Sequence, residues 1–355
     1  GDVYKRQPIS IMVGVGKAAE FGTLIRNGDA LQQAGRLDTI ILDKTGTVTE
    51  GRPSVTELVA VEGWRQDQLL QWAASLEQGS EHPLAEAIVN AARIKQLTPF
   101  DTKQFTAIAG HGVKANINGQ LVLLGNRKLM QDHNIDISAI EDSAKELTRK
   151  AQTPMFMAVA GRAVGIISVA DAIKDDSKVA IQRMHDMGLK VVLLTGDNKA
   201  TAEAVARQVG IDEVIAEVLP QDKADKVANL QLRGDRVGMV GDGINDAPAL
   251  ARADVGFAIG TGTDVAIESA DITLMLGSLH GVVDAISISQ ATVRNIKENL
   301  FGAFIYNTLG IPIAAGALFP FIGVLLNPMI AGAAMAMSSV TVVTNANRLR
   351  LLKPR

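Results

Sequence analysis

Short, continuous apolar runs alternate with segments of helical periodicity in two separate stretches of the chain, 36–50 and 166–290. The runs Thr39–Leu42, Lys190–Leu194 and Arg236–Val240 each lead into a turn that contains glycine and aspartate. Apolar strands that alternate with helices of about ten residues indicate a parallel sheet covered on both faces. The pattern therefore predicts an α/β domain assembled from these two stretches.

The stretch between them, 51–165, begins at Gly51-Arg52-Pro53 and has a different pattern, in which hairpin signals are mixed with helical segments. Asn118-Gly119 lies between two short apolar runs and predicts a two-residue β-hairpin, and Gly161 marks a second turn. We expect an inserted α+β domain with helices over 66–74 and 83–95 and strands over 105–108, 113–117, 121–124, 155–160 and 163–169.

The C-terminal region, 291–355, contains no charged residue from Leu300 to Ala346. This length allows two membrane spans of about 20 residues each. Arg294 and Lys297 precede this uncharged run and Arg348 follows it, which puts both outer ends on the cytoplasmic side. The sequence predicts a two-helix transmembrane hairpin in a multi-pass membrane protein whose catalytic domains are cytoplasmic. The alternative is a buried pair of soluble helices, which seldom lack charges over such a length.

The first 35 residues fit neither domain. Residues 1–7 are polar and match nothing that follows, so we interpret them as a foreign head. Pro8 to Arg26 is apolar but carries Lys17 and Glu20, and it is too short and too charged for a clean span. It is either the remnant of a membrane helix that continues into a cytosolic stalk or an amphipathic surface helix.

The composition narrows the chemistry. The formal net charge of −3 gives no general signature of nucleic-acid binding. The chain has no cysteine, so it can form neither a disulfide nor a thiolate metal site.

Polar groups follow the predicted parallel strands, where ligands bind in open α/β sheets. Asp43 follows the first strand, Thr195-Gly196-Asp197 follows another, Asp242 follows a third, and Lys223 opens a helix. Each group alone could be explained as turn chemistry. Together they suit phosphoryl transfer, because carboxylates bind Mg²⁺, Thr and Lys bind phosphate, and a carboxylate beside Mg²⁺ can form an aspartyl-phosphate.

Three motifs carry a family resemblance. The sequences DKTGT at 43–47, TGDN at 195–198 and GDGINDAP at 241–248 resemble the phosphorylation-domain motifs of P-type ATPases, and the resemblance runs from about Pro8 to Arg350. It implies a haloacid-dehalogenase-like, Rossmann-type phosphorylation domain in which Asp43 takes the γ-phosphate of ATP. It also implies Mg²⁺ bound by Asp43, the Thr45 carbonyl and Asp242. Around the phosphate it implies Thr195, Gly196, Lys223 and Asn245. The catalytic residues assigned in this way are Asp43, Lys44, Thr45, Thr195, Gly196, Asp197, Lys223, Asn245 and Asp246.

Thr45 separates pumps from related phosphatases. Phosphatases of the haloacid-dehalogenase fold carry a second Asp two residues after the nucleophile as a general acid/base. The residue here is Thr45, so rapid hydrolysis of an acyl-phosphate is harder and a phosphatase becomes the weaker hypothesis.

The inserted domain resembles the nucleotide-binding domain of the heavy-metal-transporting branch. The similarity lies in the run Ser80-Glu81-His82-Pro83-Leu84 and in the glycines that follow. A lone His at a helix start is more often a cap or a surface residue. The resemblance instead implies ATP binding, with close backbone approach to the nucleotide at the glycines, by Glu77, His82, Gly110, Gly112, Gly125 and Asn126.

The transported ion is inferred from the hairpin. Tyr306-Asn307 in the first helix and Met335 and Ser339 in the second resemble the positions that define copper and silver exporters. Met335 could equally be packing filler, but a thioether suits Cu(I) better than Zn²⁺. Zinc-class relatives place a Lys and an Asp there, and neither is present. The partners expected are therefore membrane lipid, ATP and a copper ion, which a copper chaperone could deliver.

Parts that the family requires do not occur in this sequence. The family has Cys-Pro-Cys before the residue that matches Pro8, and Gln7 stands there instead. The actuator domain with its Thr-Gly-Glu loop is not found either. We therefore expect a C-terminal portion of a Cu(I)-exporting pump that does not transport by itself. The alternatives are a phosphatase of the same fold, a pump of the zinc/cadmium class, and a non-enzymatic nucleotide- or metal-binding membrane module.

Overall fold

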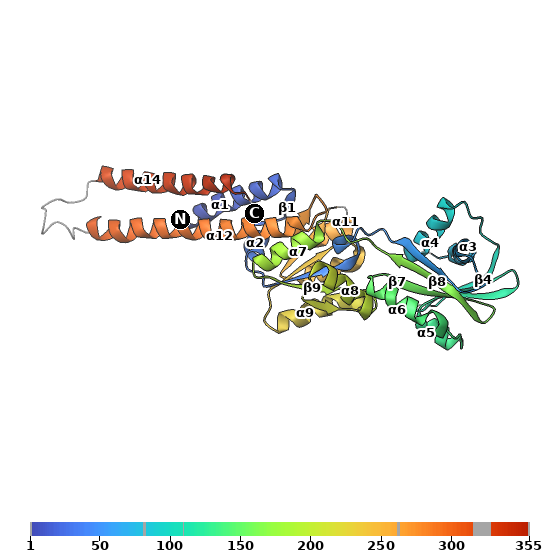
Figure 1. The fold of residues 1–355 in the computed structure, drawn as a ribbon. Coiled ribbons are helices and arrows are strands. Elements are labelled where there is room, and N and C mark those ends of the chain that lie inside the picture. The colour runs from blue at the N-terminus through green and yellow to red at the C-terminus, as the bar shows by residue number, and fades with distance from the viewer. Residues whose placement is uncertain (1, 81–82, 109, 261–262, 315–327, 354–355) are drawn as a thin grey trace. The chain divides into compact units, whose positions relative to one another are not determined.

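The computed structural model describes residues 2–80, 83–108, 110–260, 263–314 and 328–353. Within these ranges the strands form a seven-stranded sheet and a six-stranded sheet. Three long helices come from the two ends of the chain, one N-terminal helix in blue and two C-terminal helices in orange and red (Figure 1). His82 lies outside the described residues, as do the side chains of Tyr306, Asn307 and Met335.

The seven-stranded sheet has the order β1-β13-β12-β11-β2-β9-β10. The pairs β11–β2, β11–β12, β12–β13 and β9–β10 are parallel, and β1 is antiparallel to β13. Every residue of β2 and β11 is buried, as expected for a parallel sheet covered on both faces. The strands are β1 (Thr23–Ile25), β2 (Thr39–Asp43), β9 (Lys190–Leu194), β10 (Glu213–Ile215), β11 (Val237–Gly241), β12 (Val255–Ile259) and β13 (Ile272–Leu274).

Short helices connect these strands. Asn198 caps α8, since its side chain accepts a hydrogen bond from the backbone N–H of Thr201, and Gly210 ends the helix in the left-handed conformation. The helices are α2 (Gly28–Ala34), α7 (Ser177–Asp186), α8 (Lys199–Val209), α9 (Lys223–Leu232), α10 (Ala247–Arg252) and α11 (Asp264–Ser269). The βα alternation predicted for 166–290 is present from β9 to β13.

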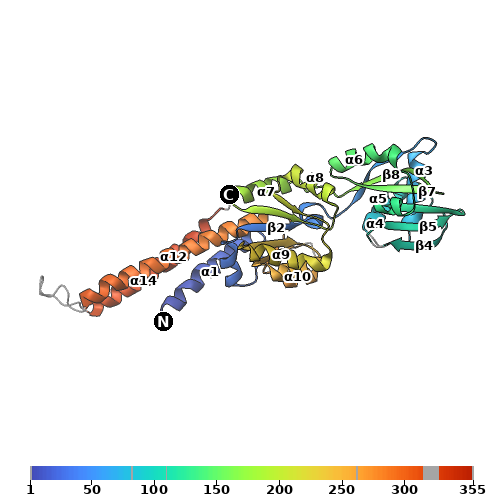
Figure 2. The ribbon, with the colours of Figure 1, turned by 90° about the horizontal axis from the view of Figure 1, so that it is seen from below.

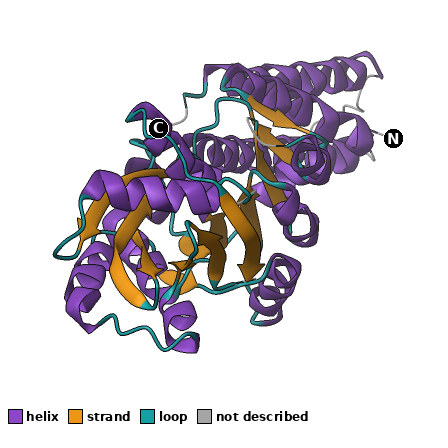
Figure 3. Ribbon diagram, turned by 90° about the vertical axis from the view of Figure 1, so that its right-hand side faces the viewer, coloured by secondary structure: helices purple, strands orange, loops and turns teal. Residues whose placement is uncertain are grey.

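The six-stranded sheet is antiparallel throughout and has the order β3-β8-β7-β6-β5-β4 (Figure 3). Its strands are β3 (Ser54–Ala60), β4 (Thr102–Ile108), β5 (Gly112–Ile117), β6 (Gln120–Gly125), β7 (Thr153–Val159) and β8 (Arg162–Ala170). Its helices are α3 (Gln66–Glu77), α4 (Pro83–Ile94), α5 (Arg127–Asp132) and α6 (Glu141–Arg149).

Each face of this sheet has its own core. Val122 and Leu124 of β6 pack in a cluster with residues of α3 and α4, whereas Leu123 packs in a second cluster with residues of α5 and α6. Alternate residues of a strand point to opposite faces, so one strand supplies both cores. The two predicted hairpin turns also form: Asn118 and Gly119 both have positive φ, and so do Ala160 and Gly161.

Three long helices pack together: α1 (Asp2–Glu20), α12 (His280–Ala314) and α14 (Pro328–Asn347) (Figure 2). Buried polar side chains join them, since Ser10 donates a hydrogen bond to Asn295 (2.8 Å) and Asn295 donates to the Asn345 carbonyl oxygen (2.8 Å). Pro8–Glu20 is therefore part of one helix, α1, which both interpretations of this segment predict, so the two interpretations stay predictions.

None of the helices in the described ranges is both long enough and apolar enough to cross a membrane. The two predicted transmembrane spans, over 300–318 and 319–346, are therefore not confirmed and stay a prediction. The residues 315–327 between α12 and α14 are outside the described ranges.

Candidate active site

Strand β2 delivers Asp43 to the carboxyl end of the seven-stranded sheet. Asp43 is its last residue and is 6% exposed. The chain then turns at Gly46, whose φ of 72° is in the left-handed region that favours glycine. Thr45, two residues after Asp43, has an extended backbone and an exposed side chain. An apolar strand followed by a glycine turn thus places one carboxylate where ligands bind in such sheets.

Three carboxylates come together at this edge. Asp43, Asp242 and Asp246 have ligand oxygens that all lie within 4.8 Å of one another. Strand β11 pairs in parallel with β2, in a register that aligns Val240 with Leu42, so the residues that follow the two strands lie at the same edge. The sequence predicted this convergence from the strand ends.

Asp246 has a different role from the other two carboxylates. Its Oδ2 accepts hydrogen bonds from the backbone N–H groups of Asp242 (3.3 Å) and Gly243 (3.2 Å). Its Oδ1 accepts one from Lys223 Nζ (2.7 Å). Asp246 therefore shapes the loop that carries Asp242 and is neutralised by Lys223, which leaves Asp43 and Asp242 as the better candidates for a metal.

The donor set suits magnesium. All three side chains offer carboxylate oxygens, which are the hard ligands that Mg²⁺ prefers. In addition, the hydroxyl of Thr47 in the turn is buried and has no hydrogen-bond partner among the residues described. Thr47 was not among the residues predicted from the sequence, although it lies within the DKTGT motif.

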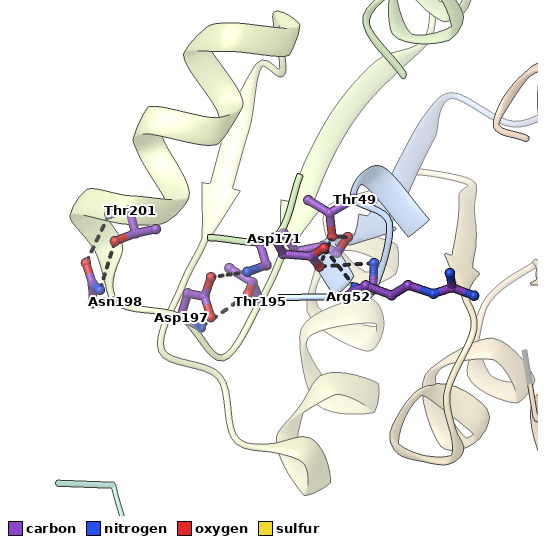
Figure 4. Close-up of polar contacts among 9 residues, drawn as sticks. Thr49, Arg52, Asp171, Thr195, Asp197, Asn198 and Thr201 are labelled. Carbon is purple, nitrogen blue, oxygen red and sulfur yellow. Dashed lines mark hydrogen bonds and ion pairs between the residues drawn. The ribbon is translucent and has the colours of Figure 1, made fainter. Parts of the chain in front are cut away.

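The residues after β9 contact the start of the turn. Lys44 Nζ lies 2.5 Å from Asp197 Oδ2 and forms an ion pair with it. Thr195 is 3% exposed, and its hydroxyl accepts a hydrogen bond from the Asp197 N–H at 3.2 Å (Figure 4). A Cβ at Gly196 would lie 3.3 Å from the Val218 carbonyl oxygen, which is a tight contact. The structure thus brings Lys44 and Asp197 together.

Lys223 and Asn245 were predicted to surround a phosphate. The Lys223 side chain is 10% exposed and is paired with Asp246, whereas Asn245 is exposed on the short turn Ile244–Asp246. Contact of either residue with phosphate stays a prediction.

Glu77 is the predicted nucleotide residue with the most unusual environment. It ends α3 and is 4% exposed, and burial raises its pKa to about 7 against the opposing effect of a hydrogen bond with Ser80. Glu77 Oε2 has no hydrogen-bond partner within the described part of the chain. A buried carboxyl with an unpaired oxygen is a candidate for ligand recognition.

The glycines of this domain have a structural explanation that the sequence did not reveal. Gly112 and Gly125 face each other across β5 and β6, and a Cβ would lie 2.3 Å from the Leu124 carbonyl oxygen at Gly112 and 2.2 Å from that of His111 at Gly125. Close approach of the two strands therefore requires both glycines. At Gly110, with φ of 72°, a Cβ would meet nothing within 4 Å.

Asn126 supports the same loop. Its side chain accepts a hydrogen bond from the Leu129 N–H (3.0 Å), which caps α5, and donates one to the Gly110 carbonyl oxygen (2.8 Å). Asn126 therefore fixes the loop whether or not a nucleotide contacts it.

The predicted ion ligands are on the packed helices α12 and α14. Tyr306 and Asn307 belong to α12, and Met335 and Ser339 belong to α14. Ser339 is exposed, and the other three side chains are outside what the structure describes. Their assembly into an ion site stays a prediction.

Sequence reasoning missed Asp171. This carboxylate accepts hydrogen bonds from Thr49 Oγ1 (2.5 Å) and from the backbone N–H groups of Gly51 (3.2 Å) and Arg52 (3.0 Å) (Figure 4). The available signal was an Asp two residues after the predicted strand 163–169, where the chain leaves the inserted domain.

Comparison with known proteins agrees with this geometry. A family model described as haloacid dehalogenase-like hydrolase matches residues 37–254. Copper-transporting ATPase 2 of Rhizobium meliloti (strain 1021) is 52% identical over 347 residues, and a copper-exporting P-type ATPase of Staphylococcus aureus (strain JH9) is 54% identical over 347 residues. Each match covers 98% of this chain and 42% of the relative.

A solved structure extends the similarity to three dimensions. The crystal structure of a zinc-transporting PIB-type ATPase in the E2.Pi state has a TM-score of 0.78 and 36% identity, over 98% of this chain and 55% of the other. This chain belongs to the heavy-metal P-type ATPase family. Within the haloacid dehalogenase-like fold, this chain carries its three carboxylates where β2 and β11 end.

Proposed function

We propose that this chain is the phosphorylation, nucleotide-binding and C-terminal part of an ATP-driven pump that exports monovalent copper or silver across a membrane. The observation that carries the proposal is the convergence of Asp43, Asp242 and Asp246 at the end of β2. Thr45, two residues after Asp43, stands where related phosphatases carry a second Asp. The chain spans 42% of the length of its copper-transporting relatives, and we propose it as one part of a pump rather than as a transporter by itself.

The proposed reaction uses Asp43 as the nucleophile. A carboxylate oxygen of Asp43 attacks the γ-phosphorus of ATP, the bond from that phosphorus to the β–γ bridging oxygen breaks, and ADP leaves. Bound Mg²⁺, for which Asp43 and Asp242 supply suitable oxygens, offsets the negative charge on the phosphate oxygens. Lys44, held by Asp197, adds a positive charge at the start of the turn.

Thr45 favours a pump over a phosphatase. A general acid/base at this position would assist attack of water on the acyl-phosphate. The Thr45 hydroxyl is a poor acid and a poor base near neutral pH, so the phosphorylated Asp43 is expected to persist. A persistent phosphoenzyme is what coupling to ion movement requires.

Phosphorylation is tested directly with the purified chain and ATP radiolabelled at the γ-phosphate. We expect an acid-stable, hydroxylamine-labile label that requires Mg²⁺ and disappears in Asp43→Asn, with Asp38→Asn as the matched control because Asp38 is outside the carboxylate group. Turnover of small phosphate esters without a preference for ATP would support the phosphatase instead. ATP binding without a label, in the complete gene product as well, would support a non-enzymatic module.

Copper rather than zinc is proposed as the ion. The copper-transporting relatives are 52–54% identical, whereas the zinc-transporting structure is 36% identical. The proposed ligands Tyr306, Asn307, Met335 and Ser339 include a thioether and no carboxylate, which suits Cu(I). This assignment includes the membrane hairpin, which we propose is formed by α12 and α14.

Competition with a chromophoric Cu(I) chelator tests the ion assignment. We expect the chain in detergent to retain Cu(I) and Ag(I), and Met335→Leu to weaken both, while Met12→Leu, a change at an exposed Met on α1, leaves them unchanged. Binding of Zn²⁺ in preference to Cu(I) would support the zinc/cadmium class.

A further inference from the structure

The turn after the nucleophile is held by a second segment, here called the clamp segment (residues 171–177). It follows β8 and precedes α7. Its counterpart, the nucleophile loop (residues 44–52), runs from the end of β2 to the start of the inserted domain. The two are separated by more than a hundred positions in the sequence but are joined by hydrogen bonds along most of the loop.

Asp171 holds the last part of the nucleophile loop. Both of its carboxylate oxygens are used: Oδ2 accepts from the Thr49 hydroxyl and the Gly51 N–H, and Oδ1 accepts from the Arg52 N–H. Thr49 is fully buried, and its backbone N–H donates a hydrogen bond to the Lys44 carbonyl oxygen (3.1 Å). A single carboxylate thus contacts the end of the loop directly and its beginning through Thr49.

The rest of the clamp segment holds the middle of the loop. Lys174 Nζ donates to the Gly46 carbonyl oxygen (2.7 Å), and the buried Ser177 hydroxyl donates to the Val48 carbonyl oxygen (2.8 Å). Backbone bonds add to these contacts, from the Lys174 N–H to Val48 (3.1 Å) and from the Glu50 N–H to Ala172 (2.8 Å). The loop therefore has little freedom to change its path.

The loop is also folded tightly on itself. A Cβ at Gly51, where φ is 73°, would lie 3.0 Å from Gly46 Cα. Gly46 and Gly51 allow the backbone to approach itself this closely. Asp171 stabilises this path of the loop through charge-assisted hydrogen bonds to the backbone at Gly51 and Arg52. Because Asp43 directly precedes the loop, the path of the loop determines the direction of the Asp43 carboxylate.

We propose that Asp171 is a positioning residue for phosphoryl transfer, which acts through Thr49 and the backbone of the nucleophile loop to hold Asp43 in its attacking geometry. The assignment rests on the phosphoryl transfer proposed above. A displacement of about 1 Å of a reacting group can lower a rate by about 10²-fold, so loss of this carboxylate affects the chemical step more than nucleotide binding.

Single-turnover labelling with γ-labelled ATP separates a positioning role from a merely structural one. In Asp171→Ala we expect the rate constant of labelling to fall by about 10²-fold, with the final amount of label and the affinity for ATP within about twofold of wild type. Asp171→Asn, which keeps one acceptor oxygen, gives an intermediate rate. Asp175→Ala, a change at an exposed carboxylate of the same segment, leaves the rate unchanged.

Two results would overturn the proposal. One is a wild-type labelling rate in both Asp171 variants. The other is a parallel loss of rate, final label and ATP affinity in Asp171→Asn, which would show damage to the fold instead of misplacement of Asp43.

Amide hydrogen exchange distinguishes failure of the positioning role of Asp171 from failure of the proposed phosphoryl transfer. We expect the amides of residues 48–52 to lose protection in Asp171→Asn, while those of β3 and β8 keep theirs. If the wild-type chain takes up no label, phosphoryl transfer fails. The exchange result then still decides whether Asp171 fixes the loop, and unchanged protection of residues 48–52 would overturn that too.

Discussion

Lys223 and Asp246 form a buried ion pair next to Asp43, the proposed nucleophile. Nζ of Lys223 lies 2.7 Å from Oδ1 of Asp246, and the two side chains are 10% and 3% exposed. The other oxygen of Asp246 binds the backbone of the loop that carries Asp242. The pair therefore links α9 to the acidic end of β11, and it adds no net charge to the remaining carboxylates Asp43 and Asp242.

Breaking this pair from one side is expected to destabilise the fold. Lys223→Met leaves the Asp246 carboxylate buried without its cation, which costs about 3–5 kcal/mol. Urea unfolding measures the loss, and Asp225→Ala, at an exposed carboxylate of α9, serves as the control. The double change Lys223→Met with Asp246→Asn should cost less than the sum of the single changes, because neither charge is then left alone. Additive costs would show that the two side chains do not interact.

A carboxylic acid at position 45 should give the proposed phosphoenzyme the rapid hydrolysis of a phosphatase. Thr45→Asp places a general acid/base at an exposed site two residues after Asp43, and we expect hydrolysis of the phosphoenzyme to accelerate roughly tenfold or more. A chase with unlabelled ATP measures the decay of the label. Thr45→Asn has nearly the same size without the acid and should decay at the wild-type rate. Equal decay in both variants would mean that this position does not control hydrolysis.

Glu77 should make the stability of the inserted domain depend on pH. Burial raises its pKa from 4.5 to about 7, so the folded state binds a proton more tightly than the unfolded state. The resulting stabilisation of the protonated folded form is fully present below about pH 4.5 and is lost as the pH rises through 7. A shift of this size corresponds to about 3 kcal/mol.

Unfolding in urea at pH 5 and at pH 8 tests this dependence. Glu77→Gln cannot ionise, so it should be more stable than wild type at pH 8 and should show a flatter pH dependence. Glu86→Gln, at an exposed position of α4, should leave the wild-type slope intact. The same slope in wild type and Glu77→Gln would contradict the raised pKa of Glu77.

Substitution of two glycines of the inserted domain, Gly125 and Gly110, by Ala should lower the free energy of unfolding by different amounts. Gly125→Ala puts a Cβ 2.2 Å from the His111 carbonyl oxygen, so β5 and β6 must move apart, and we expect a loss of at least about 2 kcal/mol. Gly110→Ala faces open space and meets only the left-handed φ, which costs about 1–2 kcal/mol. Thermal unfolding measures both. A Cβ at Gly110 contacts no neighbouring atom, so a lower ATP affinity of folded Gly110→Ala would indicate that this glycine contacts the nucleotide.

Local sequence patterns were sufficient for much of the fold. The apolar run Thr39–Leu42 predicted a buried strand, and Asn118-Gly119 predicted a hairpin in which both residues have positive φ. Such features depend on a few adjacent residues. The short strands β1 and β13 were not predicted, because three residues carry too little periodicity and each pairs with a strand far away in the sequence.

In the candidate site, too, the features that depend on adjacent residues were predicted, and those that depend on distant segments were not. The sequence placed Asp43, Asp242 and Asp246 at strand ends, and the structure brings them within 4.8 Å. It assigned Gly112 and Gly125 to nucleotide approach, whereas the packing of β5 against β6 already requires both. It did not reveal Asp171 at all, since the partners of Asp171 lie 119 to 122 positions earlier.

The amino-acid sequence establishes which groups are available for chemistry: the Asp43 carboxylate before a glycine turn, Thr45 where related phosphatases carry a second acid, and no cysteine to bind an ion. These are properties of residue types and of short-range order. Only the tertiary structure decided which groups act together. Lys223 neutralises Asp246, and Asp171 fixes the nucleophile loop, because the order of strands brings distant segments to one place where buried polar groups must find partners.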